Sequence, residues 1–182
     1  MSGLGVEAVM EALSGRGRSL LPLLEYEEVC RYAKYVWKNS RSVEALRTSL
    51  YAVRDFLSFV GMDAHQFVEG VKRGEVDVVK CLNDYIDHLY FERGVKPSTI
   101  RAGRIPYVKT FLKKNGIEVD LDELEFPRDV EGDSDRIPTR EELRDFLNAV
   151  DLKTRAAVLF LVSSGVRVGV LARLKLKHID FD

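Results

Sequence analysis

The chain has 182 residues, a formal net charge of −1 and 46% hydrophobic residues. That length suits one or two domains, and no apolar run approaches the roughly 18 residues that a membrane-spanning helix needs. The N-terminus, MSGLGVEAVMEALSG, lacks a positively charged region before a long apolar segment, so no secretory signal is expected and we predict a cytoplasmic protein.

Residues that could bind a metal ion are few and scattered. The two cysteines, Cys30 and Cys81, have no CxxC spacing, and the three histidines show no ligand spacing either. We therefore predict buried thiols, no metal site and no cofactor. Gln66 is the only glutamine, and few amide side chains combined with many charged ones are typical of thermophilic proteins.

The near-zero net charge conceals a segregation of charge along the chain. Residues 31–114 contain 16 Lys and Arg against 9 Asp and Glu, whereas residues 115–151 contain 4 against 13. Residues 152–182 are again basic, with 6 against 2. Two basic blocks on either side of an acidic one are typical of separate binding surfaces joined by a linker. The alternative is that solvated helices differ in charge by chance.

Helical spacing dominates the first two thirds of the sequence. Residues 1–24 are rich enough in glycine and serine to predict a loose N-terminal segment. After them the apolar residues recur at helical intervals. We expect a helical domain over residues 25–116, whose first helices span residues 25–38, 43–60, 64–72 and 76–92.

The helix expected over residues 43–60 has the clearest boundaries. Ser42 can cap its N-terminus, and Gly61 is a typical helix stop. Its apolar face consists of Leu46, Leu50, Val53, Leu57 and Val60. This stripe predicts one buried side and one solvent-facing side.

The last helix of this domain is expected over residues 98–114. Gly94 ends the preceding helix, and Ser98 is a suitable N-cap. Pro106 lies inside the new helix, where it predicts a kink or a break because proline removes a backbone donor.

An acidic segment follows this domain. Residues 117–137 lose their periodicity and contain Pro127 and Gly132, which predicts a linker. A second domain is therefore expected over residues 138–182.

The second domain opens with a clear helix start. Thr139 and Glu142 have the spacing of a capping box. Residues 152–163 are apolar almost all round, which predicts a buried helix. A further helix is expected over residues 167–174, and the alternation in HIDFD is typical of the start of a strand.

The sequence of this domain, IPTREELRDFLNAVDLKTRAAVLFLVSSGVRVGVLARLKLKHIDFD, resembles the opening of the catalytic domain of the tyrosine recombinases, the phage-integrase family. The shared pattern is a helix starting Pro-Thr/Ser-x-x-Glu, an apolar helix, a small-Gly-apolar-Arg turn into a Leu-rich helix, and a closing Asp-apolar-Asp. Upstream, SVEALRTSLYAVRDFLSFVG and KPSTIRAGRIPYVKTFLKKNG are similar to the family's helical core-binding domain. The resemblance spans roughly residues 25–182. It implies a mainly α fold, in which a helical, SAM-like core-binding domain precedes the helical beginning of a recombinase catalytic domain.

Arg167 occupies the small-Gly-apolar-Arg turn, and the resemblance implies that it is the first of two arginines that grip the scissile phosphate. A guanidinium at a helix start suits this role, because it offers a planar fork of donors beside the positive end of the helix dipole. The alternative is a surface arginine that only solubilises a helix end. The family usually has an acidic residue three positions later, where this chain has Val170, so the carboxylate that would orient the arginine is missing there.

The rest of the family's catalytic set is not found in this sequence. The resemblance implies a lysine on a hairpin, a His/Lys-x-x-Arg motif, a late His or Trp and a nucleophilic tyrosine, all C-terminal to the first arginine. All seven tyrosines of this sequence precede Arg167. We therefore expect this chain alone to be inactive in strand cleavage, as a fragment or a truncated product would be.

The resemblance also implies that two helices of the core-binding domain enter or cross the major groove of DNA. The expected DNA-binding residues are Arg47, Arg54, Lys96, Ser98, Thr99, Arg101, Arg104, Lys109 and Lys113. Arg101 and Arg104 fall inside the apolar arc of an ideal helix. Either their side chains reach past the first turn, or a break at Pro106 resets the helical phase. For each residue the alternative is a solvated charge on a helix surface.

The leading hypothesis is the DNA-binding and partly catalytic portion of a tyrosine recombinase, whose intact form would cleave and rejoin DNA through a 3′-phosphotyrosyl link without a cofactor. Double-stranded DNA is then the expected partner, with self-association on DNA and no membrane association. The alternatives are a truncated protein that binds DNA without chemistry and a helical interaction module that never binds DNA. Salt-dependent binding to a duplex distinguishes the last of these from the other two.

Overall fold

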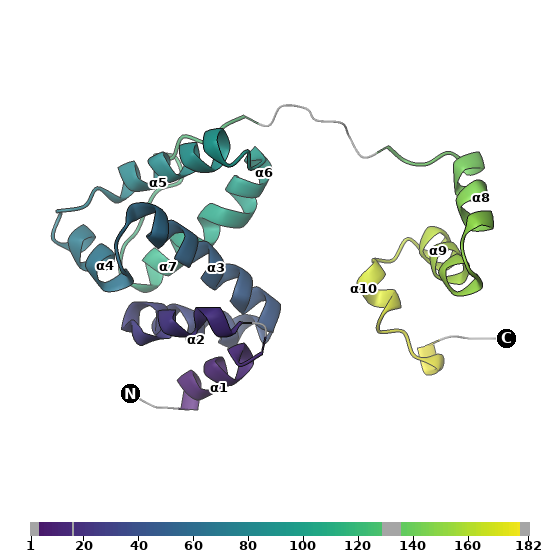
Figure 1. The fold of residues 1–182 in the computed structure, drawn as a ribbon, viewed down its shortest axis with the longest axis horizontal. Helices are drawn as coiled ribbons and strands as arrows, with labels where there is room; N and C mark the ends of the chain where they lie inside the picture. Colours follow the sequence, from purple (N-terminus) through teal and green to yellow (C-terminus); the bar gives the residue numbers. More distant parts are fainter. Residues whose placement is uncertain (1–3, 16, 129–135, 179–182) are drawn as a thin grey trace. The chain divides into compact units, whose positions relative to one another are not determined.

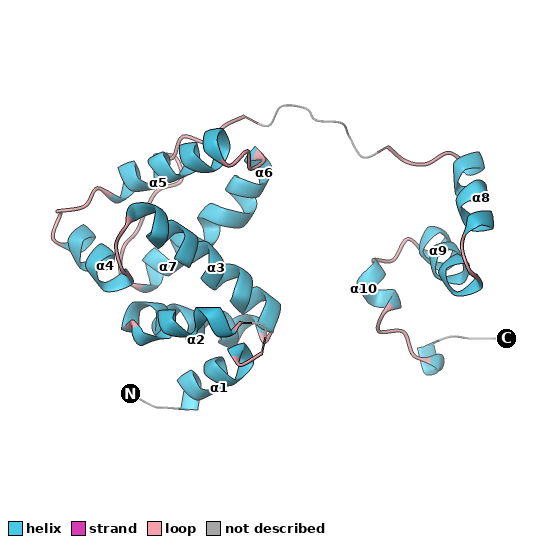
Figure 2. Ribbon diagram, in the orientation of Figure 1, coloured by secondary structure: helices cyan, strands magenta, loops and turns pink. Residues whose placement is uncertain are grey.

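The computed structural model describes residues 4–15, 17–128 and 136–178, and within these ranges the chain is mainly α-helical and contains no strand (Figures 1 and 2). The chain divides into two compact units, residues 1–130 and residues 131–182. The expectation of a mainly α fold is confirmed.

The first unit is a bundle of helices that pack around one apolar core. Its elements in chain order are α1 (Leu4–Leu13), η1 (Arg18–Glu25), α2 (Glu27–Ser40), α3 (Val43–Val60), α4 (Ala64–Lys72), α5 (Val78–Asp87), η2 (His88–Glu92), α6 (Pro97–Thr99), η3 (Ile100–Arg104) and α7 (Ile105–Lys114). Of the three elements marked η, η1 is a 3₁₀ helix, whereas η2 and η3 are single turns of π-helix.

The prediction of a loose segment over residues 1–24 is wrong for the described part of that segment. Two helices form there, and they bury Val9, Leu13 and Leu20 almost completely. Val9 and Leu13 are four residues apart and share one face of α1, a signal that the neighbouring glycines and serines obscured. Gly17 permits the turn between the helices, because a Cβ atom there would lie 2.5 Å from Cδ2 of Leu13.

Helix α3 lies at the centre of the unit and has the boundaries that the sequence predicts. The Ser42 hydroxyl accepts a hydrogen bond from the Ala45 amide at 3.3 Å, and Gly61 ends the helix in the left-handed conformation with φ 72°. The apolar face of α3 packs against α2, α5 and α7. Phe56, fully buried on this face, meets the rings of Phe67 and Tyr85 edge-on, with centroids 5.1 and 5.3 Å away.

The segment from α6 through η3 to α7 forms one continuous helical rod. The π turn η3 lies within it and changes the direction in which later side chains point. Its N-cap is Lys96, with Pro97 at the first helical position, so the prediction of Ser98 as the cap is wrong. The amide of Ile105 bonds to the carbonyl of Ile100, five residues back, which defines the π turn just before Pro106. Because proline has no amide hydrogen and its ring crowds the preceding turn, the wider turn accommodates it. The helix is therefore irregular just before Pro106, as a π turn, but it is not broken there and continues to Lys114.

The acidic segment begins as part of the first unit, in contrast to the linker predicted over residues 117–137. Ile117, Val119 and Leu124 are each at most 7% exposed. The Asn83 side chain on α5 holds the segment at two points: its amide donates to the carbonyl of Glu123 at 3.3 Å, and its oxygen accepts from the amide of Glu125 at 2.9 Å. Alternating apolar residues among the acids anchor this stretch to the core.

The pair of His65 and Glu28 joins α4 to α2 through a contact of 2.9 Å between the imidazole Nδ1 and the carboxylate. The hydrogen bond to Glu28 raises the pKa of His65 above its ordinary 6.5. A raised folded-state pKa means that this stabilisation is fully present below the unfolded-state pKa and is lost as the pH rises through the folded-state pKa.

We expect His65→Gln to lower the Tm of the first unit in mildly acidic buffer and to change it little in alkaline buffer. Thermal melts of both proteins over that range test this, and a Tm difference that does not vary with pH would contradict it.

The second unit contains α8 (Arg140–Ala149), α9 (Leu152–Ser164), α10 (Val168–Leu171) and a 3₁₀ turn, η4 (Leu176–His178). The capping box is confirmed: Thr139 Oγ1 accepts from the amide of Glu142, whose carboxylate accepts in return from the amide of Thr139. Helix α10 is shorter than the predicted helix over residues 167–174. The strand predicted in HIDFD falls mostly outside the described residues, and His178 ends the 3₁₀ turn.

Helix α9 differs from its prediction in burial. It was expected to be a buried helix, yet none of its residues is buried, and Leu152, Leu159 and Val162 are 80%, 47% and 58% exposed. The other described elements of the second unit are short helices, and they cannot cover a helix that is apolar on every side.

Candidate nucleic-acid interface

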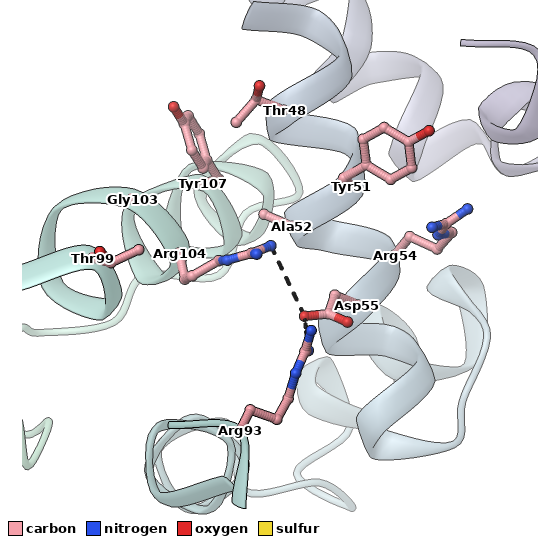
Figure 3. A pocket seen from close by; sticks show the side chains of 10 residues that line it. All are labelled: Thr48, Tyr51, Ala52, Arg54, Asp55, Arg93, Thr99, Gly103, Arg104 and Tyr107. Atoms are coloured by element: carbon pink, nitrogen blue, oxygen red, sulfur yellow. Dashed lines mark hydrogen bonds and ion pairs between the residues drawn. The ribbon is translucent and has the colours of Figure 1, made fainter. Parts of the chain in front are cut away.

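A cavity of about 510 Å³ opens between α3 and the rod that runs from α6 to α7 (Figure 3). We call it the arginine groove. It is lined by Thr48, Tyr51, Ala52, Arg54, Asp55, Arg93, Thr99, Gly103, Arg104 and Tyr107. The lining joins three separate stretches of sequence, which the packing of α3 against α7 brings together.

Helix α3 contributes one wall of the arginine groove. Thr48, Tyr51 and Asp55 recur at the helical intervals i, i+3 and i+7, so they share one face. The guanidinium of Arg54 lies over the Tyr51 ring, 4.7 Å from its centroid, a favourable cation–π geometry. The Tyr51 hydroxyl lies 3.3 Å from the Ser19 hydroxyl, which ties η1 to the edge of the groove.

The carboxylate of Asp55 is the polar centre of the arginine groove. Its Oδ2 accepts a hydrogen bond from Arg93 Nη1 at 2.6 Å and another from the Tyr85 hydroxyl at 2.9 Å. Arg104 Nη1 approaches the same oxygen at 4.0 Å. Figure 3 shows the two arginine side chains converging on Asp55 from different elements. All three charged side chains remain partly accessible, Arg93 at 42%, Arg104 at 33% and Asp55 at 30%.

Three of the predicted DNA-binding residues meet in this groove: Arg54, Thr99 and Arg104. Arg104 is the last residue of the π turn, and its guanidinium reaches toward Asp55 on α3.

Three other predicted residues, Arg101, Lys109 and Lys113, line a different cavity of about 350 Å³. The Arg101 guanidinium lies 4.9 Å from the centroid of the Phe126 ring, and Asp122 lines the same cavity. The acidic segment thus lies beside these cations. Arg101 and Lys113 are exposed there, and Lys109 is partly exposed.

The remaining predicted residues of the first unit lie outside both cavities. Lys96 and Ser98 are exposed at the start of the rod. Arg47 bonds to Glu44 at 2.8 Å, its side chain is only 19% exposed, and its Nε is buried without a hydrogen-bond partner among the described residues. Arg47 is therefore poorly placed to contact a ligand, although it shares a helix face with Arg54.

Seven residues that line the arginine groove were not predicted: Thr48, Tyr51, Ala52, Asp55, Arg93, Gly103 and Tyr107. The spacing of Thr48, Tyr51 and Asp55 in the sequence could have indicated a polar face on α3. Arg93 carries no such signal, because it is one arginine beside the helix-ending Gly94 and only the packing of η2 brings it to α3.

Arg167 lies in the second unit as the residue immediately before α10, which agrees with its predicted position at a helix start. Its side chain is exposed and makes no ion pair or hydrogen bond within the described residues. Val170 occupies the position three residues later, so no carboxylate of α10 orients the arginine there.

Among the described residues, no three side chains of His, Cys, Asp or Glu cluster as a metal site would require. No described helix is both long and apolar enough to cross a membrane. Cys30 and Cys81 are free thiols, and partial burial raises the pKa of each.

Comparison of the chain with protein-family models, with curated proteins and with solved structures finds no match in any of the three. A functional assignment therefore depends on the residues of the arginine groove and on the sequence motifs.

Proposed function

We propose that this chain is the DNA-binding portion of a site-specific tyrosine recombinase, and that the arginine groove is where duplex DNA binds. The observation that carries the proposal is the lining of one open cavity by Arg54, Arg93 and Arg104, of which Arg93 and Arg104 approach a single carboxylate, Asp55. Arginine suits phosphate recognition because its guanidinium is planar, stays charged and presents a fork of donors.

The groove has the mixture of groups that duplex backbones require. Cations neutralise phosphates and release counterions, which gives affinity. Hydroxyl groups such as those of Thr48, Thr99 and Tyr107 can donate to phosphate oxygens and fix the register on the duplex. The arginine groove is therefore suited to contacts with the DNA backbone from two elements at once, α3 and the rod that contains α7.

In the intact enzyme that we propose, a tyrosine attacks a DNA phosphate, a 3′-phosphotyrosyl link forms with release of a 5′-hydroxyl, and the reverse reaction rejoins the strands. Arg167 would neutralise the charge that develops on the phosphate. The tyrosines of this sequence all precede Arg167, and Tyr32 and Tyr85 are fully buried. We therefore propose that this chain alone binds duplex DNA without cleaving it, as a truncated non-catalytic DNA-binding protein also would.

A second candidate function is a helical protein-interaction module. The observation that favours it is the group of exposed apolar side chains in the second unit: Phe146, Leu152, Leu159, Val162, Val168 and Val170. Such surfaces are typical of association sites, and self-association on DNA would use them as well. A module that never contacts DNA predicts no salt-dependent duplex binding.

We expect the double variant Arg54→Gln/Arg104→Gln to lower the affinity for a labelled random-sequence duplex roughly 60-fold at ~0.1 M salt, because each lost phosphate contact removes a factor of about 8. The slope of log K against log salt should become shallower by about 2. Fluorescence anisotropy at several salt concentrations measures both quantities.

The matched control neutralises two exposed cations of the same unit that lie outside the arginine groove, Lys38 and Arg73. The variant Lys38→Gln/Arg73→Gln has the same net charge as the test variant and should bind nearly as the wild type does. Equal losses in the two variants would mean that net charge alone attracts DNA. No wild-type binding at low salt would refute the DNA-binding proposal and favour the interaction module.

A further inference from the structure

Asp55 presents an electrostatic difficulty for a surface that binds a polyanion. Its carboxylate is 30% exposed and lines the arginine groove, where it cancels one of three positive charges. By charge alone, this residue should weaken the binding of phosphate. A groove that keeps a carboxylate among its arginines therefore needs the carboxylate for something other than net charge.

The contacts of Asp55 indicate what that role is. One carboxylate oxygen accepts a hydrogen bond from Arg93 at 2.6 Å and lies 4.0 Å from Arg104. The two arginines are 11 positions apart: Arg93 follows the π turn η2, and Arg104 is the last residue of the π turn η3. Two guanidinium groups that approach one carboxylate repel each other less and lose much of their freedom to move. Each guanidinium has five N–H donors, so an arginine bonded once to Asp55 still has donors for a phosphate oxygen.

Asp55 is itself held from the core side of α3. The Tyr85 hydroxyl donates to the same carboxylate oxygen at 2.9 Å, and the Tyr85 ring is fully buried against Phe56. Burial, and then the hydrogen bond to Asp55, raise the pKa of Tyr85 above its ordinary value, so the phenol keeps the proton that it donates. A rigid core residue thus fixes the carboxylate, and the carboxylate fixes the arginines.

We infer that Asp55 is a positioning residue, which holds Arg93 and Arg104 as a preformed pair of donors for the phosphodiester backbone of duplex DNA. The inference rests on the proposed function and adds to it a role for Asp55, which orients two of the three arginines of the groove. Preformed donors increase affinity because less side-chain freedom is lost when the ligand binds.

The variant Asp55→Asn separates positioning from charge, because the two effects have opposite signs. Asparagine has nearly the same shape and can still accept the hydrogen bond from Tyr85. If Asp55 acts only through its charge, the variant should bind duplex DNA more tightly, by up to the factor of about 8 that one phosphate contact is worth at ~0.1 M salt. If Asp55 positions the arginines, the variant should bind about tenfold more weakly, with Asp55→Glu recovering part of the loss.

Two further proteins complete the experiment, which uses the full chain and anisotropy titrations of the same random-sequence duplex. Asp84→Asn removes an equal charge from the exposed face of α5, outside the arginine groove, and should leave binding unchanged. In an Arg93→Gln/Arg104→Gln background, the Asp55→Asn change should cause no additional loss, because the groups that it positions are gone. Thermal melts of every variant show whether the first unit remains folded.

The outcomes distinguish the inference from the proposed function. If Asp55→Asn weakens binding in the wild-type background but causes no loss in the Arg93→Gln/Arg104→Gln background, the result supports positioning. Wild-type binding with equal or tighter binding by Asp55→Asn overturns the inference and leaves the proposed function intact. A tenfold loss of affinity that persists in the Arg93→Gln/Arg104→Gln background also overturns the inference, because Asp55 would then act through another group. No wild-type binding overturns the proposed function, and the inference with it.

Discussion

Replacement of Gly103 by glutamate is expected to lower the affinity for a random-sequence duplex at least about a hundredfold at ~0.1 M salt, while the first unit stays folded. Gly103 lines the arginine groove immediately before Arg104. A glutamate there would fill part of the cavity and bring a negative charge to the place where we propose that phosphates bind. Fluorescence anisotropy measures the loss.

The fold itself gives little reason for a glycine at position 103. The residue lies within the π turn and is not among the glycines with positive φ. A Cβ atom there would find only Thr99 Cγ2 nearby, at 3.8 Å, which is an ordinary contact. Glycine in a helical segment costs about 0.5–1 kcal/mol relative to alanine, and the close approach of the DNA that we propose as ligand would give a reason for it.

Two control variants test whether the loss of affinity depends on the position of the new charge, and whether a side chain at position 103 disturbs the fold. Ala102→Glu adds the same carboxylate one residue earlier, at an exposed site that does not line the groove, and should weaken binding only about threefold through long-range repulsion. Gly103→Ala should leave the free energy of unfolding unchanged or raise it by up to about 1 kcal/mol. Equal losses in Ala102→Glu and Gly103→Glu would contradict a ligand seated on Gly103.

Phe56→Ala is expected to lower the free energy of unfolding of the first unit by about 3–5 kcal/mol. The Phe56 ring is fully buried and packs edge-on between Phe67 and Tyr85, so its removal leaves a cavity as well as lost apolar contact. Urea denaturation monitored by fluorescence measures this change, because the single tryptophan, Trp37, lies in α2 of the same unit.

Phe91→Ala is the matched control for this prediction. Its ring is 75% exposed, and substitutions at such surface positions usually change stability by no more than about 0.5 kcal/mol. Equal destabilisation by the two variants would mean that Phe56 is not central to the core. Because Tyr85 packs on Phe56 and bonds to Asp55, the Phe56 variant should also weaken duplex binding under conditions in which it remains folded.

The local elements of this protein could be predicted from the sequence because their causes are local. The N-cap at Ser42, the stop at Gly61 and the capping box from Thr139 to Glu142 depend on residues at most three positions apart. The apolar stripe of α3 follows from the helical period alone. An irregular turn beside Pro106 follows from the missing amide hydrogen, although its form as a π turn does not.

Several properties depended on distant packing and were mispredicted. The glycines near the N-terminus indicated a loose segment, yet α1 and η1 are ordered by contacts with α2 and α3. The acidic residues after position 116 indicated a linker, yet buried Ile117 and Val119 and the side chain of Asn83 hold this stretch to the bundle. Composition describes average tendencies, whereas a few apolar residues at the right spacing decide whether a segment packs.

The sequence by itself determined that this protein is mainly helical, where most of its helices begin and end, and that residues 31–114 contain an excess of Lys and Arg. Only the tertiary structure decided which cations meet. Arg54 reaches the arginine groove on α3, whereas Arg93 and Arg104 follow or end π turns. A π turn inserts one residue and rotates the helix after it by about 100°, so a regular 3.6-residue period does not predict the direction of Arg93, which follows such a turn. The carboxylate that joins two of these arginines is 38 positions from one and 49 from the other, so their meeting is a consequence of helix packing alone.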